Sequence, residues 1–155
     1  MNDTRLILRD ARREDVPAIV RMLVDDPLGS TRERYAEPLP QAYYDAFDAT
    51  AGDPNNRHLI AEVDGKIVGT LHLLFIRGIA RMGATRAQIE AVRVAAGERG
   101  EGIGRKMIEA AIEMARERGC VLVQLTTDKT RKDAHRFYES LGFVASHEGM
   151  KLSLA

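Results

Sequence analysis

The sequence predicts an α/β fold, because segments with the pattern of strands alternate with segments with the pattern of helices. The strongest observation is a β-branched strand pattern at 89–94 that leads through a glycine-rich loop into a helical pattern beginning at Ile103. Asp64-Gly65 lies between two apolar segments and is a hairpin signal. The nearly continuous apolar run 121–125 is typical of a central strand. A length of 155 residues is that of one domain with a sizeable core.

In the first part of the chain we expect a short strand at 5–9 and a helix at 13–24. Pro17 lies early enough in that helix to be tolerated. Prolines and glycines make 25–40 irregular, and a second helix is expected at 41–50.

The middle of the chain predicts strands at 59–63 and 67–75, followed by a loop from Ile76 to Arg86. His72 alternates with Leu71 and Leu73, so we expect a satisfied sheet histidine rather than a catalytic one.

The last third of the chain predicts a long helix that ends at Gly119. Cys120 is the only cysteine, and since it opens an apolar run we expect a buried strand residue rather than a nucleophile. A short helix is expected at 133–141, and a final hairpin is expected from strands at 143–145 and 150–152.

The glycine-rich loop Arg99-Gly100-Glu101-Gly102-Ile103-Gly104-Arg105 lies where a strand meets a helix. A helix start carries unpaired N–H groups and the positive end of the helix dipole. Glycines there let a ligand approach the backbone closely. The loop therefore predicts an anion site suited to a phosphate or pyrophosphate, although its spacing fits neither the Rossmann nor the P-loop pattern.

The pattern Arg99-x-x-Gly102-x-Gly104 after a strand resembles the acetyl-CoA pyrophosphate loop of the GNAT superfamily of N-acetyltransferases. Further along, Phe137-Tyr138-Glu139-Ser140-Leu141-Gly142-Phe143 resembles the C-terminal motif of the same family. The resemblance covers nearly the whole chain. It implies a single GNAT domain over 1–155, with a mixed, mostly antiparallel sheet of six or seven strands flanked by about four helices.

The resemblance also implies an acetyl-CoA-dependent N-acetyltransferase, in which the primary amine of a small molecule or peptide attacks the thioester directly. Acetyl-CoA is expected as a co-substrate, and no metal is expected. Two alternatives stay open: a catalytically weak acyl-CoA-binding regulatory module, and a transferase that uses another acyl donor.

Glu90 is the expected general base, because the acidic residue of polyamine-type and many small bacterial members aligns with it. Gln88 occupies the position of the histone-type base, and glutamine cannot accept a proton. Gln88, Glu90, Val92 and Val94 share one face if the strand is regular, whereas a bulge would change this. The alternative for Glu90 is a solvated or salt-bridged strand carboxylate.

Tyr138 matches the family tyrosine near the CoA sulfur and is the expected general acid, with a packing tyrosine as the alternative. Arg131 stands where many members have an asparagine that bonds the pantetheine, so that contact is in doubt. His135 faces either the cofactor or solvent. The residues expected to bind the cofactor are Val92, Arg93, Val94, Arg99, Gly100, Glu101, Gly102, Ile103, Gly104, Arg105, Arg131 and His135.

The sequence does not identify the acceptor; Tyr35, Tyr43 and Tyr44 either line its pocket or are half-buried aromatic residues of the helix and loop. Lys+Arg and Asp+Glu number 23 each, which argues against a dedicated nucleic-acid binder. No apolar run reaches membrane-spanning length, and the N-terminus is not a signal peptide. With a lone cysteine, these features make us expect a cytoplasmic protein that acts without a membrane. Family members are often homodimers, and the sequence leaves the oligomeric state open.

Overall fold

The computed structural model describes residues 5–155. The chain forms two compact units: an N-terminal unit that ends at Gln124 and a C-terminal unit that spans Leu125–Ala155. The single-domain organisation expected from the sequence stays a prediction. Between residues 5 and 155, no helix combines the length and apolar character needed to cross a membrane.

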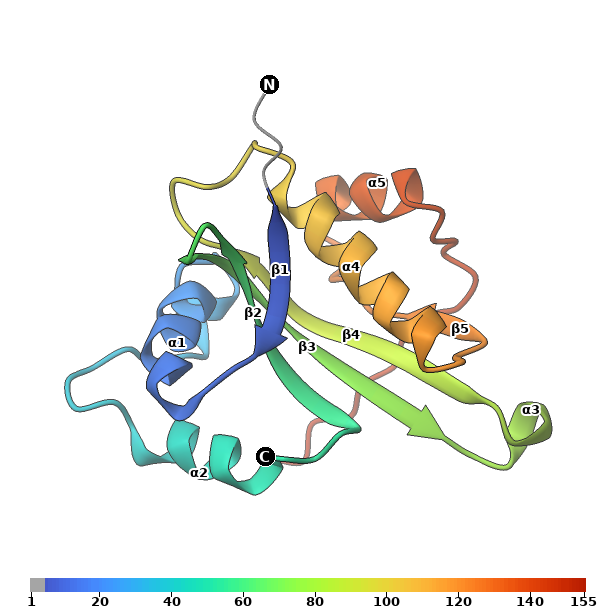
Figure 1. Cartoon of the computed structure of the whole chain (residues 1–155), viewed down its shortest axis with the longest axis horizontal. Helices are drawn as coiled ribbons and strands as arrows, with labels where there is room; N and C mark the ends of the chain where they lie inside the picture. Colours follow the sequence, from blue (N-terminus) through green and yellow to red (C-terminus); the bar gives the residue numbers. More distant parts are fainter. Residues whose placement is uncertain (1–4) are drawn as a thin grey trace. The chain divides into compact units, whose positions relative to one another are not determined.

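The N-terminal unit is built on a five-stranded sheet whose strands follow one another in chain order (Figure 1). Neighbouring strands run antiparallel, except that β4 and β5 are parallel. The strands are β1 (Leu6–Asp10), β2 (Asn56–Val63), β3 (Lys66–Arg77), β4 (Thr85–Val94) and β5 (Leu122–Gln124).

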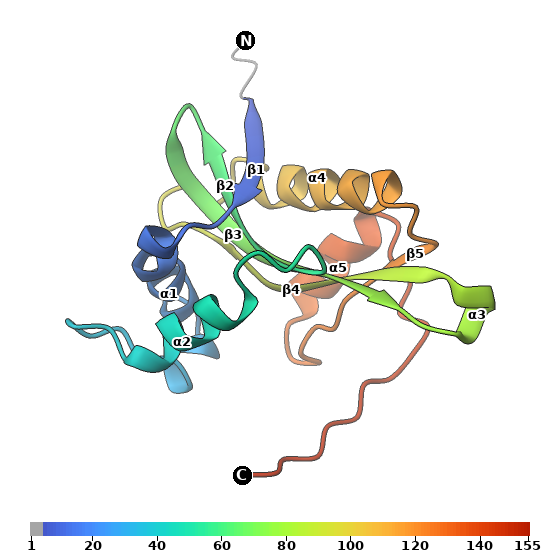
Figure 2. The ribbon, with the colours of Figure 1, turned by 60° about the horizontal axis from the view of Figure 1, so that its bottom comes forward.

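Helices cover both faces of this sheet. Figure 2 shows α4 on one face and α1 and α2 on the other. The helices are α1 (Val16–Val24), α2 (Gln41–Thr50), the single turn α3 (Ala80–Gly83) and α4 (Ile103–Glu117), with 3-10 turns at Arg13–Asp15 and Gly29–Thr31. The C-terminal unit contains α5 (Lys132–Ser140).

The core of the N-terminal unit lies between the sheet and these helices. The amphipathic pattern of α4 buries one stripe of side chains, including Met107, Ile108 and Ala111. Gly69 of β3 permits close packing there, because a Cβ at Gly69 would lie 2.5 Å from Met107 Sδ and 2.8 Å from the backbone oxygen of Arg93. A glycine in this strand therefore brings α4 and β4 close to β3.

Two turns form as the sequence predicts. Asp64 and Gly65 both have positive φ, 51° and 78°, as a two-residue hairpin turn requires. At the end of α4, Gly119 has a φ of 79°. The Gly119 N–H donates to Arg116 O and the Cys120 N–H donates to Ala115 O, so the last carbonyls of α4 are satisfied.

Several expectations are corrected. Within residues 5–155 the sheet has five strands rather than six or seven. The expected hairpin of 143–145 and 150–152 does not form: Ser146 N–H donates locally to Val144 O, and Val144, Met150 and Leu152 are exposed. A loop was expected at 76–86, but β3 extends to Arg77 and β4 begins at Thr85, and the single turn α3 lies between these strands.

Cys120 is half-buried but is not a strand residue, because its N–H completes the cap of α4 before β5 begins at Leu122. Partial burial raises the pKa of its thiol, so the thiol is protonated near neutral pH, which agrees with the expectation that it is not a nucleophile.

Candidate functional site

A bulge interrupts β4 in the middle of the sheet. Glu90 pairs with His72 of β3 and Arg93 pairs with Thr70, so Ala91 and Val92 together oppose one residue of β3. Ala91 has a φ of 53°, which is uncommon for a residue with a side chain. Bulges of this kind redirect side chains and are frequent next to active sites.

The bulge corrects the expected facing of β4. Opposed residues of an antiparallel pair project to the same face, so Arg93 lies on the face of Glu90 and Val94 on the other. A regular strand would have placed Gln88, Glu90, Val92 and Val94 on one face, but the alternative with a bulge holds: Gln88 and Glu90 share a face, and Val94 does not, because two residues take the space of one at the bulge.

Glu90 is exposed, and its cross-strand neighbour His72 on the same face lines a hollow together with residues of α1 and α2. Its Oε1 accepts a hydrogen bond of 2.6 Å from Nε2 of Gln88, two residues earlier on the same face. Its neighbour across the strand is His72, whose pKa the charge of Glu90 tends to raise. The carboxylate is thus oriented by one amide and stays open to solvent.

His72 stacks on His58 of β2, with ring centroids 4.2 Å apart and planes 20° apart. Its Nε2 lies 2.5 Å from Asn56 Oδ1, which accepts the ring N–H. Burial lowers the pKa of His58, and burial together with His58 lowers the pKa of His72 to about 4. Both rings are therefore neutral near pH 7, and His72 is the satisfied sheet histidine that the sequence predicts.

A hollow of about 150 Å³ opens between α1, α2 and the sheet beside the bulge. Ala91 and His72 form part of its wall, and most of the rest is apolar. It is lined by Val16, Ile19, Val20, Leu23, Tyr43, Ala46, Phe47, His58, Thr70, Leu71, His72 and Ala91.

Of the three tyrosines expected near an acceptor, only Tyr43 lines this hollow. Its hydroxyl donates to Glu33 Oε1 at 3.0 Å and accepts from the Arg34 N–H at 3.0 Å. Tyr35 and Tyr44 instead lie against the guanidinium groups of Arg21 and Arg13, each 4.5 Å from the ring centroid.

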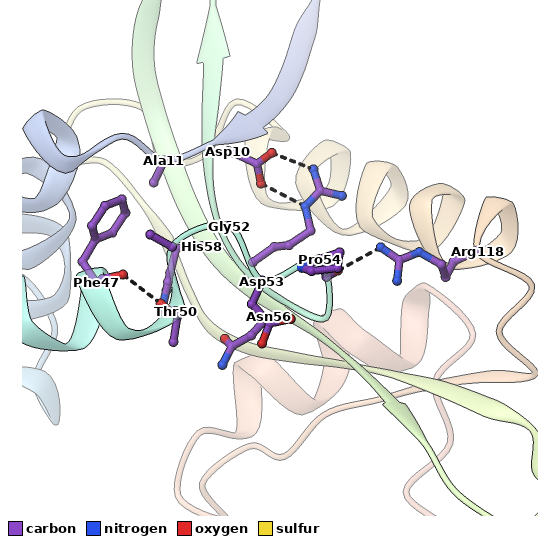
Figure 3. A pocket seen from close by; sticks show the side chains of 12 residues that line it. Asp10, Ala11, Phe47, Thr50, Gly52, Asp53, Pro54, Asn56, His58 and Arg118 are labelled. Atoms are coloured by element: carbon purple, nitrogen blue, oxygen red, sulfur yellow. Dashed lines mark hydrogen bonds and ion pairs between the residues drawn. The ribbon is translucent and has the colours of Figure 1, made fainter.

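A second hollow of about 490 Å³ lies where the end of α2 meets the start of β2 (Figure 3). Its walls carry several polar side chains, with an ion pair of 2.9 Å between Arg57 and Asp10. Arg118 donates to Pro54 O at 2.9 Å on the same side (Figure 3). His58 is common to both hollows, but only the smaller one is lined by the bulge.

The glycine-rich loop ends where α4 begins. Gly102 is the N-cap with a φ of 74°, and Gly100 has a φ of 84°. A Cβ at either glycine would meet no atom within 4 Å, so the loop backbone faces open space. Because Gly102 has no side chain, no capping side chain covers the N–H groups at the start of α4. This geometry suits an anion.

The arginines around this loop contact the irregular segment after α1. Arg99 donates to Asp25 O at 2.9 Å and Asp25 Oδ2 at 3.3 Å, and its Nε donates to Val94 O at 3.3 Å. Arg93 donates to Val92 O at 2.9 Å and pairs with Asp26 at 3.7 Å, where both side chains are largely buried. The carbonyls of Val92 and Val94 thus already accept hydrogen bonds from arginines.

Two other loop residues keep their charges at the surface. Arg105 pairs with Glu109 one turn along α4 at 2.9 Å, with both side chains about half exposed. Glu101 is exposed in the loop. Ile103 is buried as the first residue of α4, so its side chain anchors the helix and only its backbone can reach a ligand.

Three expected residues belong to the C-terminal unit. Arg131 is the N-cap of α5 and its carbonyl accepts from the His135 N–H at 3.2 Å. His135 Nε2 is buried with no hydrogen-bond partner among the described residues. The Tyr138 ring contacts Phe137 and Phe143 edge to face, with centroids 5.1 and 5.7 Å away.

Sequence reasoning missed His58, Asn56 and Gln124 as neighbours of the expected site. Each is brought close by strand pairing, which no local pattern specifies. Over residues 5–155, no cluster of three or more His, Cys, Asp or Glu side chains could hold a metal ion.

The sequence profile of the acetyltransferase (GNAT) family matches residues 18–143. The chain is 37% identical over 145 residues to an aminoalkylphosphonate N-acetyltransferase of Salmonella typhimurium, covering 88% of this chain and 92% of that protein. A solved structure of a transcriptional regulator from Bacillus halodurans is 48% identical with a TM-score of 0.92, covering 97% and 100% of the two chains. A Trypanosoma brucei acetyltransferase structure is 27% identical with a TM-score of 0.76, covering 97% and 100%.

Proposed function

The chain belongs to the acetyltransferase (GNAT) family, and from this premise we propose that it transfers the acetyl group of acetyl-CoA to a primary amine, with Glu90 as the base. The family and the curated N-acetyltransferase relatives identify an acetyltransferase enzyme. The donor, the acceptor and the residue roles are the proposal. One observation carries it: the exposed Glu90 directly precedes the bulge residue Ala91, which lines an apolar hollow, and β4 is followed by the loop to the open helix start at Gly102.

The chemistry requires a proton acceptor. An alkyl ammonium has a pKa of about 10.4, so forming the free amine at pH 7 costs about 4.6 kcal/mol. An exposed carboxylate such as Glu90 takes this proton directly or through water. The amine nitrogen then bonds to the thioester carbon, the carbon–sulfur bond breaks, and the electron pair leaves with sulfur as thiolate. Tyr138 is the proposed donor of the proton that the thiolate takes up.

The glycine-rich loop fits the pyrophosphate of the donor. The backbone at Gly100 and Gly102 faces open space, and the N–H groups at the start of α4 carry the positive end of the helix dipole. Arg99 and Arg105 add two positive charges beside this start. Arg99 contacts Asp25 and Val94 O in this structure, so we expect a pyrophosphate to compete with Asp25 for its guanidinium.

The hollow beside the bulge favours an amine with a small apolar substituent. Its volume of about 150 Å³ is below the roughly 300–1,000 Å³ of typical small-molecule sites. Its histidines have lowered pKa values and are neutral at pH 7, and its lining, as far as the structure describes it, includes no Arg or Lys. Such walls offer no positive charge that would stabilise a buried anionic phosphonate. We therefore expect this chain to prefer alkylamines to the acceptor class of its Salmonella relative.

Glu90→Gln tests the base. The change should lower kcat/KM for the amine by about 10²–10⁴ at pH 7, the usual contribution of a general base. The loss should shrink toward pH 10, where solvent supplies free amine. Glu113→Gln is the matched control, because Glu113 is an exposed carboxylate on α4 that pairs with Arg116 one turn away. If Glu90→Gln keeps the wild-type pH–rate profile, Glu90 is not the base and is only a surface carboxylate.

The acceptor preference is tested with n-butylamine, 2-phenylethylamine and 2-aminoethylphosphonate as probes. The alkylamines should give the higher kcat/KM. Ala46→Leu extends a side chain into the hollow and should raise KM for the bulkier amine, whereas Ala49→Leu, exposed on the same helix outside the hollow, should not. A tenfold preference for the phosphonate would contradict the apolar site.

A further inference from the structure

A chain of amide side chains runs from β5 to the carboxylate of Glu90. Nε2 of Gln124 donates to Oε1 of Gln88 at 2.8 Å, and Nε2 of Gln88 donates to Oε1 of Glu90 at 2.6 Å. All three side chains belong to the N-terminal unit. We infer that Gln88 and Gln124 are positioning residues, which hold the Glu90 carboxylate in the orientation that accepts the amine's proton. This inference rests on the proposed role of Glu90.

The order of donors and acceptors in these two hydrogen bonds is set by Glu90. An ionised carboxylate can only accept, so Gln88 must present its NH₂ group to Glu90. The carbonyl oxygen of Gln88 then points the other way and requires a donor, which the NH₂ group of Gln124 supplies. Each amide is thereby locked in one of its two flipped states. Glu90 Oε2, which has no hydrogen bond to the described residues, remains for the substrate or a water.

Strand pairing builds this arrangement. Gln88 lies opposite Gln124 in the parallel ladder and is two residues from Glu90, so the three side chains fall on one face. The pair Gln88–Gln124 is the last of the β4–β5 ladder, and the bulge begins three residues later at Ala91, directly after Glu90. Gln88 and Gln124 are partly buried, whereas Glu90 is exposed, so the amides anchor a carboxylate that would otherwise sample several rotamers.

The effect on rate follows from orientation. Misplacing a reacting group by about 1 Å can cost about 10²-fold in rate. Removing the Gln88 amide leaves the carboxylate in place but free to rotate, so we expect a loss of about 10-fold in kcat/KM for the amine. Removing the Gln124 amide leaves Gln88 in place with a free carbonyl, so we expect a smaller loss of about 3-fold.

The test is a double-mutant cycle on the full chain with n-butylamine or, if that is a poor acceptor, the best amine of the panel. Gln88→Met and Gln124→Met keep side-chain length and remove the amide. Each is made alone and in a Glu90→Gln background, with kcat/KM, acetyl-CoA affinity and the melting temperature measured. Gln41→Met is the matched control, because Gln41 is exposed on α2 and its amide donates to Asp45 one turn along the same helix.

The expected result is a loss in kcat/KM for both single variants, with acetyl-CoA affinity and melting temperature within error of wild type. In the Glu90→Gln background the same changes should have no further effect, because there is no carboxylate left to orient. Full kcat/KM in both single variants, or equal losses with and without Glu90, would overturn the inference. If Glu90→Gln alone is fully active, the proposed base fails instead, and the two failures are thus distinguished.

Discussion

Acidification should destabilise the N-terminal unit through the stacked pair His58 and His72. The pKa of His72 falls from 6.5 to about 4 on folding, mainly by burial, and the pKa of His58 also falls. Between these values the unfolded chain binds more protons than the folded chain, so the free energy of unfolding decreases as the pH falls. The stability is fully present above pH 6.5 and is lost progressively toward pH 4.

The magnitude follows from the difference between the two pKa values of His72. The difference between 6.5 and about 4 lowers the free energy of unfolding by at most about 3.4 kcal/mol once His72 is fully protonated in the folded state. At pH 5 the same difference lowers it by about 2 kcal/mol. The ring is only partly buried and solvent screens its charge, so we expect about 1 kcal/mol from His72 at pH 5. Asp15 does not interfere, because its pKa is lowered, chiefly by Arg9, and its contribution is lost only below pH 3.8.

Urea unfolding at pH 7.0, 6.0, 5.0 and 4.5 measures this loss directly. His72→Asn should reduce the pH dependence, because only His58 of the stacked pair then titrates, whereas His147→Asn should leave it as in wild type, since His147 is exposed in the C-terminal unit. A wild-type stability that is constant from pH 6.5 to 4.5, or an unchanged slope in His72→Asn, would refute the reasoning.

Three further predictions concern other elements. Gly69→Ala should lower the free energy of unfolding by about 1–3 kcal/mol, because its Cβ would meet the Arg93 backbone oxygen at 2.8 Å; Gly78→Ala, with no atom within 4 Å, should change it by under about 0.5 kcal/mol in urea unfolding. Gly104→Val should weaken CoA binding in calorimetry by at least about 10-fold with the melting temperature nearly kept, and unchanged affinity would contradict the loop's assignment. Tyr138→Phe should lower kcat by about 10²–10⁴ if the phenol is the acid; a loss of about 1 kcal/mol in stability with kcat kept would show a packing role.

Local signals in the sequence predicted most of the fold. The helices α1, α2, α4 and α5, the turn at Asp64-Gly65 and the cap at Gly119 each depend on residues close together in the chain, so their patterns are complete in a short window. The single turn α3 lies in a segment that was expected to be a loop. The C-terminal hairpin was predicted from two short apolar runs, and such runs do not specify whether a partner strand exists. The strand count was too high for the same reason.

The candidate site was predicted less completely, because pairing between strands builds most of it. Glu90 and the glycine loop are visible in the sequence, but the bulge at Ala91 changes which side chains share the face of Glu90. Gln88 was considered only as a residue that cannot be a base. Its contact with Gln124 depends on the register of a parallel ladder, which no short pattern records.

The most direct test of the central claim is release of CoA thiol from acetyl-CoA by the full chain with a panel of primary amines, followed with a thiol-detecting reagent. The account predicts thiol release that depends on the amine, exceeds hydrolysis without amine, and is greatest for alkylamines with small apolar substituents. Tight acetyl-CoA binding in calorimetry without amine-dependent thiol release from any amine of the panel would contradict it and favour an acyl-CoA-binding module.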